Sequence, residues 1–211
     1  MIIQKCVKMI LMISTRKELK KFIKADFIMN YGEYSFKRRI ICLLSGDLIS
    51  KFLKQLRKTE YSVNKRSIFA SLQKFRLKKI SYKAGFSIAL NVFDYGLVIP
   101  HHGTIVVGSG NKIGRFCVLH TSTCIGEGEK NIGDGFYLSA GAKVFKNITI
   151  ANNVSIGSNS LVNKPILKAN SLYAGVPALY IKESEPWYVR DGEKYEKRVK
   201  DSISLFNCKK R

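Results

Sequence analysis

An apolar side chain recurs about every six residues through the second half of this 211-residue chain. The residue four positions later is usually small, as at Gly103, Ser109, Cys117, Thr123, Ala142 and Ser160. The twelve apolar positions are Phe93, Ile99, Ile105, Ile113, Leu119, Ile125, Ile132, Leu138, Val144, Ile150, Ile156 and Val162. A hexapeptide period is typical of a parallel β-helix, in which three short strands form each triangular coil. The large side chain fills the prism, and a small one shares that space without overpacking it.

Two irregularities interrupt the period. The register slips by two residues at Asn111-Lys112 and by one before Ile132, which predicts bulges at two corners. Glu129 then falls on an inward position, and we expect a local loop there because an unpaired buried carboxylate is costly. An ordinary sheet with coincidental spacing is the alternative, and twelve hexads disfavour it.

Helical patterns flank the repeat. Thr15 and Glu18 have the spacing of a capping box, and apolar residues follow at helical intervals. A second helix is predicted from about 36 to 58, weakened midway by Gly46, a third from about 65 to 79, and a charged helical tail over 191–206. The apolar face of the second consists of Ile41, Leu44, Leu48, Phe52 and Leu56. The segment 173–178 is expected to be a turn that leaves the prism.

These patterns predict an α+β chain: a left-handed parallel β-helix with an N-terminal α-helical region and a short C-terminal helical tail. The expected boundaries are 1–84 for the basic helices, 85–182 for the β-helix and 183–211 for the tail. No flexible linker precedes the repeat, so we expect the helices to dock on the prism or on a neighbouring subunit. Docking also covers an open solenoid end, which otherwise exposes apolar side chains and strand edges.

Positive charge is concentrated in the helical region. The whole chain carries +22, of which residues 1–85 contribute +16 and residues 86–182 only +4. This excess is compatible with attraction to nucleic acid, an anionic membrane or an acidic polymer. A solvated lysine-rich surface is the favoured interpretation, because no nucleic-acid-binding motif accompanies the charge. We therefore expect no nucleic-acid partner.

The cysteines and the N-terminus indicate a cytoplasmic protein. The five cysteines are odd in number and lack a Cys-x-x-Cys spacing, so neither a disulfide framework nor a thiolate zinc site is predicted. A reducing cytoplasm suits them. The apolar run 9–13 is too short to span a bilayer and no cleavage site follows it, so we expect no signal peptide and no membrane span.

All three histidines, His101, His102 and His120, fall within the repeat. The hexad frame places His101 and His120 near each other on adjacent coils, and strand alternation points His102 to the opposite side. A histidine cluster on a rigid scaffold favours a functional role over a surface one. Some parallel β-helices bind zinc through three histidines between subunits, but no His-x4-His pair is present here. We therefore expect no metal.

The region 85–182 resembles the acyl-CoA-dependent hexapeptide acetyltransferases, most closely the serine acetyltransferase-like enzymes found with surface-polysaccharide genes. The stretch from Gly85 to Val107 carries the resemblance, and its segment His-x-Gly-Thr-Ile-Val-Val is the most specific part. Gly141-Ala-Lys143 and Ala174-Gly-Val-Pro-Ala178 support it, and Ile23-Lys-Ala-Asp26 is a weaker echo. The resemblance implies transfer of an acetyl group from acetyl-CoA to a hydroxyl of a small acceptor, serine in the family.

The same resemblance implies roles for individual residues. His101 matches the catalytic histidine, the general base that takes the proton of the acceptor hydroxyl. A carboxylate usually orients that histidine, and Asp94 is the nearest candidate, although a turn aspartate is an equally good interpretation. His120 is placed to contact the acceptor or the tetrahedral intermediate. Acetyl-CoA is expected between neighbouring prisms of a homotrimer, or a dimer of trimers, along turns that include Ala140, Ser158, Asn163 and Lys164.

One departure from the family leaves the acceptor open. The family often carries a long glycine-rich loop after the coil that corresponds to Ile125-Gly126, with a second histidine in the true serine acetyltransferases. This chain has only Glu127-Gly-Glu-Lys-Asn131 there. A saccharide or polysaccharide-precursor acceptor is therefore the alternative to serine. A non-catalytic solenoid that binds a partner or an anionic surface through its basic helices is the second alternative.

Overall fold

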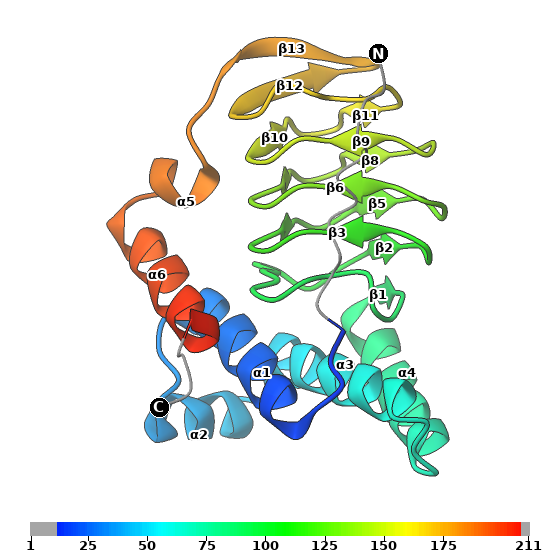
Figure 1. Ribbon diagram of the computed structural model, residues 1–211, viewed down its shortest axis with the longest axis vertical. Coiled ribbons are helices and arrows are strands. Elements are labelled where there is room, and N and C mark those ends of the chain that lie inside the picture. Colours follow the sequence, from blue (N-terminus) through cyan, green and yellow to red (C-terminus); the bar gives the residue numbers. More distant parts are fainter. Residues whose placement is uncertain (1–11, 208–211) are drawn as a thin grey trace.

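A helical base, a parallel β-solenoid and a helical tail make up the structure, a computed structural model that describes residues 12–207 (Figure 1). The base contains α1 (Arg16–Tyr31), α2 (Phe36–Leu44), α3 (Leu48–Asn64) and α4 (Ala70–Ala84), and the tail contains α5 (Trp187–Arg190) and α6 (Glu193–Asn207). This arrangement confirms the predicted fold class. None of the helices within 12–207 is long and apolar enough to cross a membrane. The apolar run 9–13 lies largely outside the described residues.

Three sheets form the sides of the prism. Sheet A contains β1 (Phe86–Ile88), β2 (Ile105–Val107), β5 (Thr123–Ile125), β8 (Lys143–Val144) and β11 (Leu161–Val162). Sheet B contains β3 (Lys112–Ile113), β6 (Asn131–Ile132) and β9 (Thr149–Ile150). Sheet C contains β4 (Val118–Leu119), β7 (Tyr137–Leu138), β10 (Val154–Ile156), β12 (Ser171–Gly175) and β13 (Ala178–Glu183). Strands of successive coils pair in parallel, as in β2 with β5.

The hexad positions form the core of the solenoid. All twelve predicted apolar side chains are at most 3% exposed. The small partners Cys117, Thr123, Ala142 and Ser160 are also buried, whereas Ser109, which precedes the two-residue slip, is exposed. Each strand is only two to five residues long apart from β13, so most of its stability comes from this shared interior rather than from isolated strand pairing.

The two register slips form tight corners. Glu129 is exposed in a loop, as predicted, and the adjacent Lys130 is buried instead. The ammonium group of Lys130 donates hydrogen bonds to the carbonyl oxygens of Gly126 at 2.9 Å and Glu127 at 3.0 Å. Asn111 Nδ2 donates to the same Gly126 carbonyl at 2.9 Å. These two side chains satisfy main-chain acceptors that the slips remove from the strand ladders.

The end of the solenoid differs from its prediction. The segment 173–178 was expected to leave the prism as a turn, but it joins β12 to β13 in an antiparallel hairpin that extends sheet C. The exposed side chains of Leu179 and Ile181 lie on β13, the edge strand. The hexad pattern had ended, so periodicity gave no indication of this added strand.

The helical base also departs in part from its predicted pattern. The capping box is confirmed, since Thr15 Oγ1 accepts from the Glu18 N–H and the Glu18 carboxylate accepts from the Thr15 N–H. The single helix predicted over 36–58 is wrong, because Gly46 adopts a φ of 72° and separates α2 from α3. Asp47 then caps α3 by accepting a hydrogen bond from the Ile49 N–H at 2.9 Å. The third helix begins and ends about five residues later than predicted.

A buried ionic network docks the base on the first coil. Arg57 is fully buried, and its Nε donates to Asp26 Oδ2 at 2.7 Å while Nη1 donates to Glu60 Oε2 at 3.0 Å. Arg57 Nη2 also donates to the main-chain carbonyl of Asp94 at 2.7 Å, and Asp26 Oδ1 accepts from the Gly96 N–H at 2.7 Å. Burial alone would lower the pKa of Arg57, but the two carboxylates raise it. The helices therefore dock on the prism, and Phe52 and Leu56 join its core.

The tail folds back along the outer face of sheet C to the base (Figure 1). Trp187 is buried and its indole N–H donates to the Phe116 carbonyl at 2.8 Å. Arg198 donates to the Met29 carbonyl at 2.9 Å, and the ring of Phe206 stacks on Tyr95 with centroids 3.9 Å apart. These contacts confirm a helical tail. The domain boundaries at 84 and 182 remain a prediction.

Candidate functional site

The histidines lie at the corner where the chain passes from sheet C to sheet A. His101 lies between Val98, which bridges to β4, and strand β2, and His120 lies between β4 and β5. We call this edge of the prism the histidine corner; its successive coils present His101 and His102, then His120 and Thr121, then Ser139 and Ala140, then Gly157 and Ser158. Main-chain hydrogen bonds between coils hold it together, as from the Gly141 N–H to the Thr121 carbonyl at 3.1 Å.

Of the two predicted catalytic histidines, His120 is more buried than His101. It is half-buried, and its Nε2 lies 2.7 Å from the Tyr137 hydroxyl, the bond direction depending on the tautomer. Its main-chain N–H donates to the Leu138 carbonyl at 3.1 Å, and its carbonyl accepts from the Thr123 hydroxyl at 2.7 Å. Both its backbone and its ring are therefore fixed by the neighbouring coil.

The electrostatic surroundings of His120 favour the neutral ring. Burial lowers the pKa of His120 below its ordinary value, the charge of nearby His101 lowers it further, and Asp191 opposes both by raising it. At neutral pH the ring is therefore uncharged and can accept or donate a hydrogen bond. Because Val98 pairs with Val118, His101 and His120 follow equivalent strands of successive coils at the same corner.

His101 and His102 are exposed and lie in an irregular turn rather than in a strand. The expectation that strand alternation separates them therefore does not apply. No hydrogen bond joins either imidazole to another residue in the part of the chain from 12 to 207. Both rings are exposed at the corner, and the charge of His101 lowers the pKa of His120.

Asp94 does not lie beside His101. Asp94 follows the bridge between Phe93 and Ile113, at the corner between sheets B and C. His101 lies at the next corner, between sheets C and A, so one side of the prism separates the two residues. The Asp94 side chain is buried, and Oδ1 accepts a hydrogen bond from the Tyr95 N–H at 2.8 Å. This placement favours the interpretation of Asp94 as a turn aspartate, and its orienting role remains a prediction.

The predicted cofactor residues fall at two corners. Ala140 and Ser158 lie at the histidine corner, where the Asn159 N–H donates to the Ala140 carbonyl at 2.9 Å. Asn163 and Lys164 follow β11, at the corner between sheets A and B. Lys164 is exposed, and Asn163 Oδ1 is a buried atom that accepts no hydrogen bond from the described residues. Within one prism these two pairs are separated by the width of sheet A.

The C-terminal segment adds residues that the sequence did not indicate. The guanidinium of Arg190 lies over the Tyr137 ring, 4.9 Å from its centroid, and donates to Ser155 Oγ at 3.3 Å and to Asp191 Oδ1 at 2.9 Å. Tyr137, Arg190 and Asp191 thus form a group of side chains next to His120. No pattern links positions about 70 residues apart; the lone tryptophan at Trp187 was the one sign that this tail is buried.

The loop after Gly126 is short and contains no histidine, since residues 127–131 are Glu, Gly, Glu, Lys and Asn. Lys130 closes this corner by its two main-chain hydrogen bonds, and the Glu129 N–H donates to Asn147 Oδ1 at 2.9 Å. Ser109 donates to the Glu127 carboxylate across it. Within residues 12–207, no three His, Cys, Asp or Glu side chains are grouped so that they could hold a metal ion.

Comparison with known proteins gives a consistent result for the solenoid. The chain is 34% identical over 94 residues to a serine acetyltransferase of Staphylococcus xylosus, a match that spans 41% of this chain and 43% of the relative. Its structure resembles the serine acetyltransferase of Neisseria gonorrhoeae, with a TM-score of 0.63, 23% identity and coverage of 80% of this chain and 66% of the other. The chain has the serine acetyltransferase fold.

A serine acetyltransferase solved as a complex with CoA is a further structural neighbour, with a TM-score of 0.58 and 22% identity over 77% of this chain and 68% of the other. No family model matches the chain. The chain spans less than half the length of the curated relative from Staphylococcus xylosus. The sequence likeness thus covers less than half of this chain, whereas the likeness of fold extends over most of it.

Proposed function

We propose that this protein is an O-acetyltransferase that moves an acetyl group from acetyl-CoA to a hydroxyl of a small acceptor, with serine as the first candidate. The observation that carries the proposal is the histidine corner, where His101 and His120 occupy successive coils of one edge of the prism. A relative from Staphylococcus xylosus is named serine acetyltransferase, and one structural neighbour is a serine acetyltransferase in complex with CoA.

His101 acts as general base in this proposal. Its neutral imidazole takes the hydroxyl proton as the acceptor oxygen bonds to the thioester carbonyl carbon. The tetrahedral intermediate then collapses, the carbon–sulfur bond breaks, and the imidazolium returns the proton to the departing CoA thiolate. No enzyme nucleophile is required, because the thioester is already activated and correct placement of the reactants supplies much of the rate enhancement.

In this proposal His120, supported by the neighbouring side chains of Tyr137, Arg190 and Asp191, positions the acceptor. The Tyr137 hydroxyl fixes the ring of His120, and the lowered pKa keeps that ring neutral. When the Tyr137 hydroxyl donates to Nε2, the Nδ1–H of His120 remains available to the acceptor or to the oxyanion of the intermediate. The guanidinium of Arg190 packs on the ring of Tyr137. The tail is thus part of the proposed site.

A homotrimer, alone or as a dimer of trimers, accounts for the division of the cofactor residues. If the sheet A–B corner of one prism faces the histidine corner of the next, Asn163 and Lys164 approach the histidines together with Ala140 and Ser158. The unpaired Asn163 Oδ1 can then accept a hydrogen bond from CoA, and Lys164 can contact one of its phosphates. Light scattering of the purified chain is expected to give three or six times the protomer mass.

Replacement of the base gives the sharpest test. His101→Ala is expected to lower the rate of thiol release from acetyl-CoA by about 10² to 10⁴. His102→Ala is the matched control, because His102 is equally exposed and adjacent but has no assigned role. Near-normal turnover by His101→Ala, or an equal loss in both variants, would contradict the role of His101.

A saccharide acceptor is the second candidate. The observation that favours it is the tight corner at Lys130, which lacks the long loop and additional histidine of the serine enzymes. Thiol release in the presence of serine is to be compared with release in the presence of nucleotide sugars, at equal acetyl-CoA. Faster release with serine supports the first proposal, and faster release with a sugar supports the second. Release with neither acceptor favours the non-catalytic alternative.

A further inference from the structure

Helix α2 presents an apolar surface that no part of the described chain covers. Phe36 is 75% exposed, Leu43 68% and Leu44 81%, whereas Cys42 is the buried side chain of this helix. Ile41 is also exposed. Large apolar side chains gathered on one short helix mark an interaction site more often than a solvated surface. The notable feature is that this helix lies on the highly charged base.

Basic side chains are interleaved with these apolar ones. Lys37, Arg38 and Arg39 lie on α2 itself, and Lys51 and Lys54 lie on the adjoining turns of α3. None of these five cations forms an ion pair with another residue between 12 and 207. The pKa of Lys54 is lowered by partial burial and by the charges of Lys58 and Arg39, which shows that cations crowd together here.

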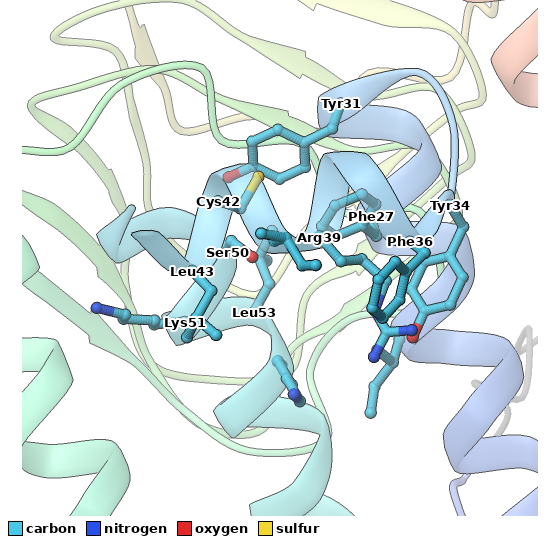
Figure 2. A pocket seen from close by; sticks show the side chains of 13 residues that line it. Phe27, Tyr31, Tyr34, Phe36, Arg39, Cys42, Leu43, Ser50, Lys51 and Leu53 are labelled. Atoms are coloured by element: carbon cyan, nitrogen blue, oxygen red, sulfur yellow. The ribbon is translucent and has the colours of Figure 1, made fainter. Parts of the chain in front are cut away.

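A pocket of about 260 Å³ opens beside this helix. Figure 2 shows Phe27, Tyr34 and Phe36 grouped at one side of it, Tyr31 beside Cys42, and Leu43 and Leu53 at another side. Arg39, Lys51 and Lys54 also line it, so cationic groups adjoin a mainly apolar interior. This combination suits a molecule with an apolar chain and an anionic head group.

We propose that α2 and this pocket bind the surface of a bilayer that contains anionic lipids. We call this surface the basic apolar face; it consists of Phe36, Lys37, Arg38, Arg39, Ile40, Ile41, Leu43, Leu44, Lys51 and Lys54. The apolar side chains of α2 enter the boundary between head groups and acyl chains, and the cations contact the lipid phosphates. The helix has nine residues, which lets it lie in the interface and is far too short to span it.

The positive charge and the apolar side chains of this face together favour an anionic bilayer over a second copy of the chain or a nucleic acid. A second copy would bring the same cations, on a base segment of +16, against these cations. Nucleic acid would satisfy the positive charge but would leave Phe36, Leu43 and Leu44 without a partner. An anionic bilayer offers phosphates to the cations and acyl chains to the apolar side chains at one surface. This inference does not depend on the proposed acetyl transfer.

Flotation with lipid vesicles tests the inference. The full chain is expected to float with phosphatidylcholine vesicles that contain phosphatidylglycerol, and to remain behind with phosphatidylcholine alone. Phe36→Ser combined with Leu44→Ser is expected to weaken binding about tenfold or more, and Arg38→Glu combined with Arg39→Glu to do so as well. These side chains are exposed, so the melting temperature of each variant should stay near that of the unmodified chain.

Matched controls lie on the solenoid. Leu179→Ser with Ile181→Ser removes two similarly exposed apolar side chains from β13, and Lys146→Glu with Lys182→Glu reverses two exposed cations. Both controls should bind vesicles like the unmodified chain. Absence of binding to the anionic vesicles would overturn the inference. So would loss of binding in the charge variant alone, which indicates adsorption without insertion, or self-association that the apolar variant abolishes.

Discussion

The solenoid and the helical base use apolar residues in opposite ways. In the solenoid, every apolar position of the repeat is at most 3% exposed, because each strand has one side that faces the prism interior. In the base, α3 buries Phe52 and Leu56, whereas the neighbouring α2 leaves Phe36 and Leu44 largely exposed. The same kind of amphipathic pattern therefore stabilises the fold in one region and forms a free surface in the other. Experiments can separate these two uses.

The largest effect on stability is expected where the two regions meet. Asp26→Ala removes the carboxylate that binds Arg57 and the main chain of the first coil, and leaves the buried guanidinium with Glu60 as its remaining carboxylate partner. Breaking a buried ion pair in this way costs about 3 to 5 kcal/mol. The free energy of unfolding by urea measures it. A change below about 1 kcal/mol, as for an exposed pair, would mean that the network does not dock the base.

A matched pair of leucines tests the comparison itself. Leu138→Ala opens a cavity in the prism and is expected to cost about 2 to 5 kcal/mol of unfolding free energy. Leu44→Ala makes the same chemical change on the exposed surface of α2, where an effect within about 0.5 kcal/mol is expected. Equal losses at the two positions would show that α2 is covered and would remove the basis of the basic apolar face.

The smallest effects concern the charge state of His120. Burial and the charge of His101 both lower its pKa, whereas Asp191 raises it. The NMR titration midpoint of His120 should therefore lie below about 6.5, the ordinary value of histidine. Removing a positive neighbour by His101→Ala should raise that midpoint, and removing a negative one by Asp191→Asn should lower it. His102→Ala serves as the control and should leave it unchanged. Opposite shifts would refute the proximity of these groups.

The sequence predicted those parts of the molecule that follow local rules. The period placed all twelve core side chains, and the Thr15 and Glu18 spacing located the start of α1, because both depend on a few neighbouring residues. The helix break at Gly46 was underestimated. A glycine inside a helix costs about 1 kcal/mol relative to alanine, and the capping residue Asp47 directly after Gly46 starts a new helix at this weak point.

The hexapeptide period could not predict contacts in the site between residues that are distant in sequence. His101 and His120 could be related because the coil repeat converts sequence spacing into position on an edge. Asp94 was proposed for its nearness to His101 in sequence, but it follows the bridge between Phe93 and Ile113, at a different corner of the coil from His101. Arg190 reaches Tyr137 from a tail outside the repeat, so no periodicity predicts that contact. The burial of Lys130 by hydrogen bonds to two main-chain carbonyls was likewise not indicated by the period.

The central claim is that the solenoid, rather than the base, carries the ligand site, and coenzyme A binding tests it most directly. A ligand of the native state raises the melting temperature, and saturation at 100 times its dissociation constant corresponds to about 2.7 kcal/mol. We expect coenzyme A to raise the melting temperature of the unmodified chain and of the Phe36→Ser, Leu44→Ser variant equally. Ser158→Trp, which fills the histidine corner at an exposed position, should abolish the rise. No rise in the unmodified chain, or an undiminished rise in Ser158→Trp, would contradict the account.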